Sequence, residues 1–322
     1  MRRALLALLC ACGQVDAGTP ATSVTGTFAL HDFFVGDTTR DGETSPSAWK
    51  SFGRNIDGRV TDANSTDVCT LASGAPRANQ ADGEDGIDNA FGAVFVPNMR
   101  GDVGPAESVQ MTQAMQAGKW SLQIQVTGLS NDPTQTSTGL VARAFDAAPL
   151  DAPPAFDDTT SWPVSSSSLT DGATIAGGAL ATFPDATITN GVFDSGPSMG
   201  PLHFTLSTNG TVVPLVLHTP RITFTHAART DAIDGTLSGV LDVQELLATV
   251  GAIASHISPQ LCGDGFYGIG AQISEAADIL HDGTNAPGVP CDGISVGFGF
   301  DAKLIANPTE VVPAAPLVNA CP

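Results

Sequence analysis

Residues 202–217 read LHFTLSTNGTVVPLVL, and this stretch decides the fold. An Asn-Gly pair flanked by alternating apolar residues predicts a β-hairpin with a two-residue turn. With the turn at Asn209-Gly210, one face carries three apolar pairs: Leu206 with Val213, Phe204 with Leu215, and Leu202 with Leu217. A slip of one residue would mix the two faces, so the register is well specified. Pro214 has no N–H to donate to a ladder, and we expect it at an edge or a bulge.

Further strands are predicted on both sides of this hairpin by the same period-2 alternation of apolar and polar residues. The segments are 24–30, 120–126, 139–145, 221–225 and 294–302. In the last of them, Gly297 and Gly299 share one face, which indicates either close approach of another backbone or a bend. The chain also has 35 Gly and 22 Pro, which favour short strands and turns. We therefore expect a mainly β, sandwich-like fold in one large or two small domains.

A few short helices are expected as insertions in the β framework. One is predicted over residues 106–117. Asp242-Val243-Gln244-Glu245 resembles a capping box and predicts a second helix that ends at Ser258-Pro259. A third is predicted over residues 269–281. Residues 36–88 are rich in Gly, Asp, Asn and Thr and are expected to form loops and short strands.

Residues 146–158 carry three Pro and four Asp, which is typical of a linker or a long loop. We place a domain boundary there. The expected organisation is a β-rich domain over residues 23–148, containing an acidic loop, and a β-rich domain with inserted helices over residues 159–322.

The N-terminus has the layout of a secretory signal. Two Arg precede an apolar run over residues 4–9, which is too short to span a bilayer. The sequence Leu9-Cys10-Ala11-Cys12 then resembles the lipobox of bacterial lipoproteins. The alternative is an ordinary cleaved signal peptide with incidental Cys residues.

The resemblance to bacterial lipoproteins implies cleavage before Cys12. Residues 1–11 would be the signal peptide, Cys12 would carry acyl chains such as palmitate, and residues 12–22 would form a lipidated tether. Gly13 follows the lipidated position where retained lipoproteins have Asp, which implies delivery to the outer membrane. We therefore expect an exported protein of the cell envelope, whose N-terminal lipid anchor makes the membrane a partner.

Four Cys remain after such cleavage: Cys69, Cys262, Cys291 and Cys321. An even number in an exported chain predicts two disulfides, with three possible connectivities. We favour Cys262–Cys291, which closes a local loop, and Cys69–Cys321, which ties the C-terminus to the N-terminal half. A metal site is the weaker alternative, because the sequence has no Cys-x-x-Cys pair.

The charge is strongly acidic, with 33 Asp and Glu against 13 Lys and Arg and a net charge of −20. Losing Arg2 and Arg3 with the signal peptide makes it −22. This charge balance argues against binding to nucleic acid, whose phosphates need clustered cations. It also argues against binding to an anionic membrane surface. The densest acidic segment contains Asp82, Glu84, Asp85 and Asp88, separated by glycines. Carboxylates at this spacing could converge on Ca²⁺. The alternative is a solvated turn.

No convincing catalytic set is present. Gly196-Pro197-Ser198-Met199-Gly200 matches the pattern of a hydrolase nucleophile elbow, but Pro201 and a predicted strand follow where a helix is needed. We therefore expect an envelope-anchored lipoprotein with a binding or structural role at the cell surface. Its extracellular ligand is unspecified. The alternative is an exported hydrolase that uses acidic residues and a structural calcium ion.

Overall fold

The computed structural model describes residues 24–99, 105–208, 211–228, 230–316 and 321. Within these residues, eleven strands belong to one sheet, and the helices are short. The chain is thus mainly β, as the sequence predicts. The lipobox at Leu9–Cys12, the tether that follows it and the turn at Asn209-Gly210 lie outside the described residues.

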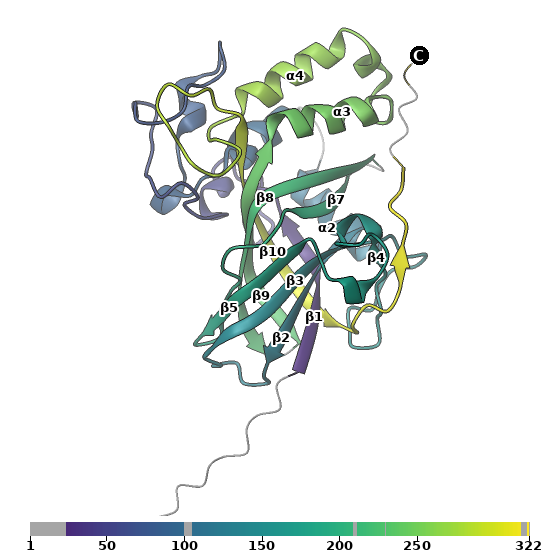
Figure 1. The fold of residues 1–322 in the computed structure, drawn as a ribbon. Coiled ribbons are helices and arrows are strands. Elements are labelled where there is room, and N and C mark those ends of the chain that lie inside the picture. The colour runs from purple at the N-terminus through teal and green to yellow at the C-terminus, as the bar shows by residue number, and fades with distance from the viewer. Residues whose placement is uncertain (1–23, 100–104, 209–210, 229, 317–320, 322) are drawn as a thin grey trace, which may run out of the picture.

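Eight strands form an antiparallel sheet that closes on itself (Figure 1). Each pairs with the next, and the last pairs with the first. They follow the order β1 (Val24–Phe34), β2 (Ser121–Leu129), β3 (Ser137–Ala147), β5 (Ala181–Thr189), β6 (Val192–Asp194), β8 (Thr211–Ala228), β9 (Asp231–Asp242) and β10 (Gly293–Ile305). Three strands extend this ring: β7 (Leu202–Thr208) pairs with β8, while β4 (Val164–Ser165) joins β3 to β11 (Val311–Val312).

Opposite walls of the closed sheet face each other across one apolar core, in the sandwich-like packing that the sequence predicts. Phe28 of β1 meets Phe224 of β8 across the interior, with ring centroids 5.7 Å apart. Residues 146–158, where the sequence predicts a domain boundary, comprise the end of β3 and part of the loop that leads to β4 of this same sheet.

The register predicted for the β7–β8 hairpin is confirmed. Leu202 pairs with Leu217, Phe204 with Leu215, and Leu206 with Val213. Pro214 lies in the part of β8 that pairs with β7 alone, because pairing with β9 begins only at Leu217. The N–H of Thr205, opposite Pro214, donates to the Asp146 carboxylate at 2.9 Å. Because the Thr205 N–H points away from β8, Thr205 and Pro214 do not exchange hydrogen bonds across the hairpin. The missing N–H of Pro214 therefore removes no hydrogen bond from the β7–β8 ladder.

The helices lie mainly at one end of the sheet. They are α1 (Val96–Met99), α2 (Glu107–Gln116), α3 (Val243–Ile257) and α4 (Gly265–Glu275). Short turns of 3₁₀ helix are η1 (Ala48–Ser51), η2 (Arg77–Gln80), η3 (Glu84–Gly86), η5 (Ser166–Ser168), η6 (Ile175–Gly177) and η7 (Pro259–Cys262), and η4 (Phe91–Phe95) is a π-helical turn. Figure 1 shows α3 and α4 side by side, beyond the end of the sheet opposite the start of β1.

The cap predicted for α3 is confirmed, because the Asp242 carboxylate accepts the N–H groups of Gln244 and Glu245 at 2.7 and 2.9 Å. The prediction of a helix over residues 269–281 is wrong in its bounds. The helix begins four residues earlier and ends at Glu275, because Asp278 and Ile279 donate their N–H groups to Gly293 instead. Tertiary pairing with the start of β10 thus overrides helical periodicity there.

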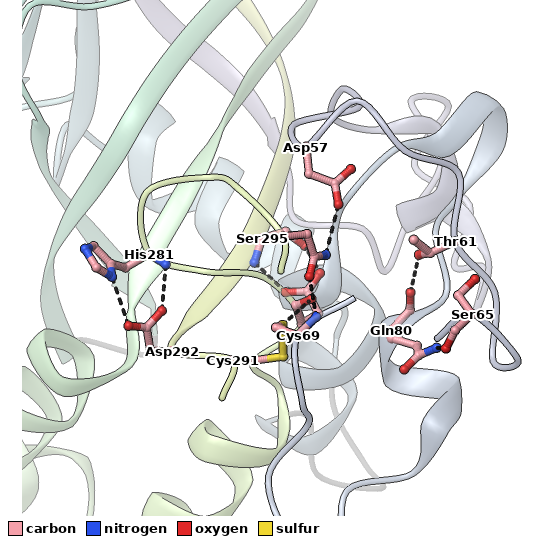
Figure 2. Close-up of a disulfide and its surroundings, with 11 residues drawn as sticks. Asp57, Thr61, Ser65, Cys69, Gln80, His281, Cys291, Asp292 and Ser295 are labelled. Atoms are coloured by element: carbon pink, nitrogen blue, oxygen red, sulfur yellow. Dashed lines mark hydrogen bonds and ion pairs between the residues drawn. A yellow bond between two sulfur atoms is a disulfide. The ribbon is translucent and has the colours of Figure 1, made fainter. Parts of the chain in front are cut away.

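Two disulfides form among the four predicted Cys, but the favoured pairing is wrong. The bonds are Cys69–Cys291 and Cys262–Cys321, which join residues 222 and 59 positions apart. Cys69 lies beside Cys291 (Figure 2), because Thr70 exchanges backbone hydrogen bonds with Val289 and Cys291. The Cys262–Cys291 pairing was favoured because these two residues are close in the sequence. The fold instead brings Cys69 to the segment before β10.

Candidate functional site

The acidic loop that the sequence predicts as a calcium site uses two of its carboxylates to hold neighbouring backbone. Asp82 accepts hydrogen bonds from the N–H and the hydroxyl of Thr61, at 2.5 and 2.7 Å. Asp88 accepts the N–H of Ile56 at 2.5 Å. Both carboxylates therefore fasten residues 56–61 to the acidic segment.

The other two predicted ligands turn away. Glu84 and Asp85 are exposed, and Asp85 has a positive φ of 53° within a tight turn. Across the described part of the chain, no group of three or more His, Cys, Asp or Glu side chains is placed to hold a metal ion. The structure therefore does not bring Asp82, Glu84, Asp85 and Asp88 together as a cation site.

Two buried carboxyls lie where the loops of residues 36–95 meet β10: Asp278 bonds to β10 itself, and Asp88 bonds within the loops. Asp278 accepts the N–H and hydroxyl of Ser295 (labelled in Figure 2) at 2.8 and 2.6 Å. The Ser295 hydroxyl oxygen in turn accepts the N–H of Ala90. Burial raises the pKa of Asp278 to about 7. Burial, together with the nearby charge of Asp278, raises the pKa of Asp88 to about 8. This arrangement is a structural network whose protonation changes near neutral pH.

A cavity of about 350 Å³ lies where the helices meet the β7–β8 hairpin. Its walls come from η4, α1, α2, β7, β8, α3 and α4, so segments from residue 91 to residue 272 build one pocket. The apolar lining residues are Phe91, Phe95, Met111, Leu206, Val213, Leu215, Leu246, Val250, Ile257 and Ile269. The pocket is the candidate functional site, because pockets of roughly 300–1,000 Å³ with mostly apolar walls are typical of small-molecule sites.

The local sequence explains how each wall is positioned. Leu206 and Leu215 lie on the apolar face that the hairpin register fixes. Leu246 and Val250 are four residues apart, which places them on the same face of α3. Phe91 is held by an edge-to-face contact with Phe298 of β10, with ring centroids 5.3 Å apart. The pocket is therefore bounded by regular, packed elements.

A few polar groups interrupt the apolar lining: Asn98, Glu107, Thr211 and Gln272. Glu107 is the first residue of α2 and is only 7% exposed. One of its carboxylate oxygens accepts the amide of Gln110 at 3.3 Å. The positive end of the helix dipole favours a carboxylate at this position. No Lys, Arg or His occurs among the described lining residues.

Sequence reasoning singled out none of these residues as a site. The apolar spacing of Leu246, Val250 and Ile257 was visible, but it indicated only the inner face of a helix. Ser198, in contrast, lies in a loop with its hydroxyl bonded to the carbonyl of Gly200 at 2.7 Å, as expected for a residue outside a nucleophile elbow. Cys12 lies outside the described residues.

In the part of the chain that the structure describes, no helix combines the length and apolarity needed to cross a membrane. Comparisons with protein-family models, with curated proteins and with solved structures found no match to this chain.

Proposed function

We propose that this protein is an exported lipoprotein, anchored to the bacterial outer membrane through Cys12, that binds a small, largely apolar ligand. The observation that carries the binding role is the apolar pocket between α2, α3 and the β7–β8 hairpin. The lipobox resemblance at Leu9–Cys12 supports the anchor. The two disulfides support export, because such bonds persist in oxidising compartments.

The size and lining of the pocket favour a ligand-binding site over a defect in core packing. A buried water molecule needs two to four polar partners, and only Asn98, Glu107, Thr211 and Gln272 interrupt the apolar lining of this pocket. An empty apolar space of this size also loses dispersion contacts along its whole lining. An apolar ligand would restore those contacts without requiring any new polar partner.

The position of the pocket is compatible with membrane anchoring. β1 begins at Val24, at the end of the sheet opposite α3 and α4 (Figure 1). A lipid attached at Cys12 would therefore hold the first strand towards the membrane. The helices and the pocket lie at the other end of the sheet from this attachment point.

Binding can be measured with N-phenyl-1-naphthylamine, an uncharged dye that fluoresces in apolar surroundings. The chain from residue 13 onward avoids interference from its own lipid. We expect a saturable fluorescence increase with one dye bound per chain. Val250→Trp fills the pocket and should weaken dye binding at least tenfold. Ala248→Trp, on the exposed side of the same helix, should leave it unchanged.

Val250 is buried, so its replacement by Trp needs a check of folding. Ile257→Trp offers a second test, because Ile257 lines the pocket yet is 39% exposed and can accept a larger side chain. The proposal is refuted if folded wild-type protein does not bind the dye. Equal binding by wild type and both folded pocket variants would refute it as well.

The alternative proposal, an exported hydrolase with a structural calcium ion in the 82–88 loop, has less support. Asp82 and Asp88 already accept backbone N–H groups, and Glu84 and Asp85 point to solvent. We expect the melting temperature of the protein to be the same in millimolar Ca²⁺ and in chelator. A rise of several degrees with Ca²⁺ would favour the alternative.

A further inference from the structure

We infer that α4 is the gate of the pocket: its N-terminal part moves away from α3 to admit a ligand and packs back afterwards. This inference deepens the proposed function and rests on it. It concerns how a ligand enters and leaves the pocket, which the lining alone does not specify.

The wall that α4 contributes to the pocket is its outer wall. Figure 1 shows α4 on the side of α3 that faces away from the sheet. Ile269 and Gln272 of α4 line the pocket, although Ile269 is only half-buried and Gln272 is exposed. The lining residues Met111, Leu206 and Leu215, from α2 and the β7–β8 hairpin, are at most 5% exposed. Displacing α4 therefore opens the pocket without disturbing the sheet.

The sequence of α4 makes it a weak helix. Three of its eleven residues are Gly: Gly265, Gly268 and Gly270. Only Pro is less favourable than Gly in the interior of a helix. The side chain of Asp264, at the N-cap, makes no capping hydrogen bond, whereas Asp242 caps α3. The helix therefore depends on tertiary packing for its stability.

The packing of α4 is slight. Ile273, near its C-terminal end, is the one buried residue among the eleven, all of which the structure describes. Two contacts with α3 are made at glycines: Phe266 lies against Gly251, and Gly270 lies against Leu247. Segments with few buried apolar contacts open at a lower free energy than the core does. The N-terminal part of α4 is therefore the part of the pocket wall that opens most easily.

Both ends of α4 are held, so opening leaves it attached. Cys262, in η7 just before the helix, is bonded to Cys321. At the other end, the Asn79 amide donates to the carbonyl of Glu275 at 2.8 Å. Gly263 lies between the disulfide and the helix, and a Cβ built there would meet no heavy atom within 4 Å. Hinges consist of a few loop or terminal residues whose φ and ψ change, and Gly263 fits that role.

The test is stopped-flow fluorescence of N-phenyl-1-naphthylamine binding to the chain from residue 13 onward. Gly268→Ala strengthens α4 at a position where a Cβ meets open space, and Ala271→Gly weakens it at an exposed position. Neither residue lines the pocket. We expect Gly268→Ala to slow both association and dissociation of the dye about fivefold, and Ala271→Gly to speed both by about the same factor. The dissociation constant should stay within about twofold, because a gate changes both rates in the same direction.

Ala248→Gly is the matched control, because it makes the same change at an exposed position of α3, which is capped and has five buried residues. It should leave both rates as in wild type. Rates that neither α4 variant changes would overturn the inference. An altered dissociation constant with an unchanged association rate would also overturn it, because α4 would then be a fixed wall. In both cases dye binding would still support the proposed function, whereas failure of wild type to bind the dye would refute both.

Discussion

At the residue scale, Gly297 shows how the loops attach to the sheet. The Asn89 side chain accepts the N–H of Gly297 at 3.0 Å and donates to its carbonyl at 2.9 Å, in the manner of a neighbouring strand. The backbone of Phe52 and Gly53 lies directly against the same residue. From the sequence, the glycines of β10 indicated either such a close approach or a bend, and the structure shows the close approach. The partner, Asn89, could not be predicted, because it lies 208 positions away.

Replacing Gly297 by Ala should destabilise the protein. A Cβ at this position would overlap the carbonyl oxygen of Phe52, and backbone cannot move aside as a side chain can. We expect the free energy of unfolding in urea to fall by about 1–3 kcal/mol, the usual cost of overpacking.

Gly268→Ala is the control for this change. Gly268 lies in α4, and no heavy atom lies within 4 Å of a Cβ built there. Ala is favoured over Gly in a helix, so this variant should be neutral or more stable by about 0.5–1 kcal/mol. Equal effects of the two substitutions would contradict the packing described around Gly297.

At the element scale, local signals were reliable where an element depends on its own residues. The β7–β8 register follows from its turn and its alternation, and α3 follows from its cap and its apolar face. The bounds of α4 and the two disulfide pairings were not predictable in this way. Each depends on where the segment before β10 lies, and that is fixed by pairing with β9 and with the loops.

The carboxyls of Asp88, within the loops, and of Asp278, at their contact with β10, make the stability of this region depend on pH. Their pKa values in the folded protein, about 8 and about 7, lie above the value of about 3.9 for an unfolded Asp. The folded protein therefore keeps protons that the unfolded chain releases. The free energy of unfolding should fall as the pH rises from about 4 to about 8.

Urea unfolding at pH 5.5 and pH 8.5 measures this dependence. Asp278→Asn is the informative variant, because its amide oxygen can still accept the N–H of Ser295 without carrying a charge. The variant should lose less stability between the two pH values than wild type does. A wild type that is more stable at pH 8.5 would contradict the raised pKa values.

At the scale of the whole molecule, the mainly β class was predictable and the closure of the sheet was not. Closure depends on the β1–β10 and β3–β5 pairings, which join distant segments that no local pattern links. The pocket was hidden for the same reason. Its lining combines residues that each look like ordinary core, and only the fold reveals the space between them.

The anchor is also a property of the whole molecule. Replacing Cys12 by Ala removes the thiol that the lipobox resemblance assigns to lipidation, whereas Cys10→Ala should do little. We expect the Cys12→Ala protein to leave the membrane fraction and Cys10→Ala to remain in it. Stable anchoring requires more than one acyl chain, and the Cys12→Ala protein would carry none at this position. Its loss from the membrane fraction should therefore be nearly complete. Wild-type levels of the Cys12→Ala protein in membranes would refute the anchor.

The location of a bound ligand tests the central claim most directly. In crystals of the chain from residue 13 onward grown with 12-bromododecan-1-ol, anomalous scattering locates the bromine. The account predicts one bromine site inside the pocket, among Met111, Leu215 and Val250. Crystals with no bromine there, or with bromine only on the outer surface of the helices, would contradict it.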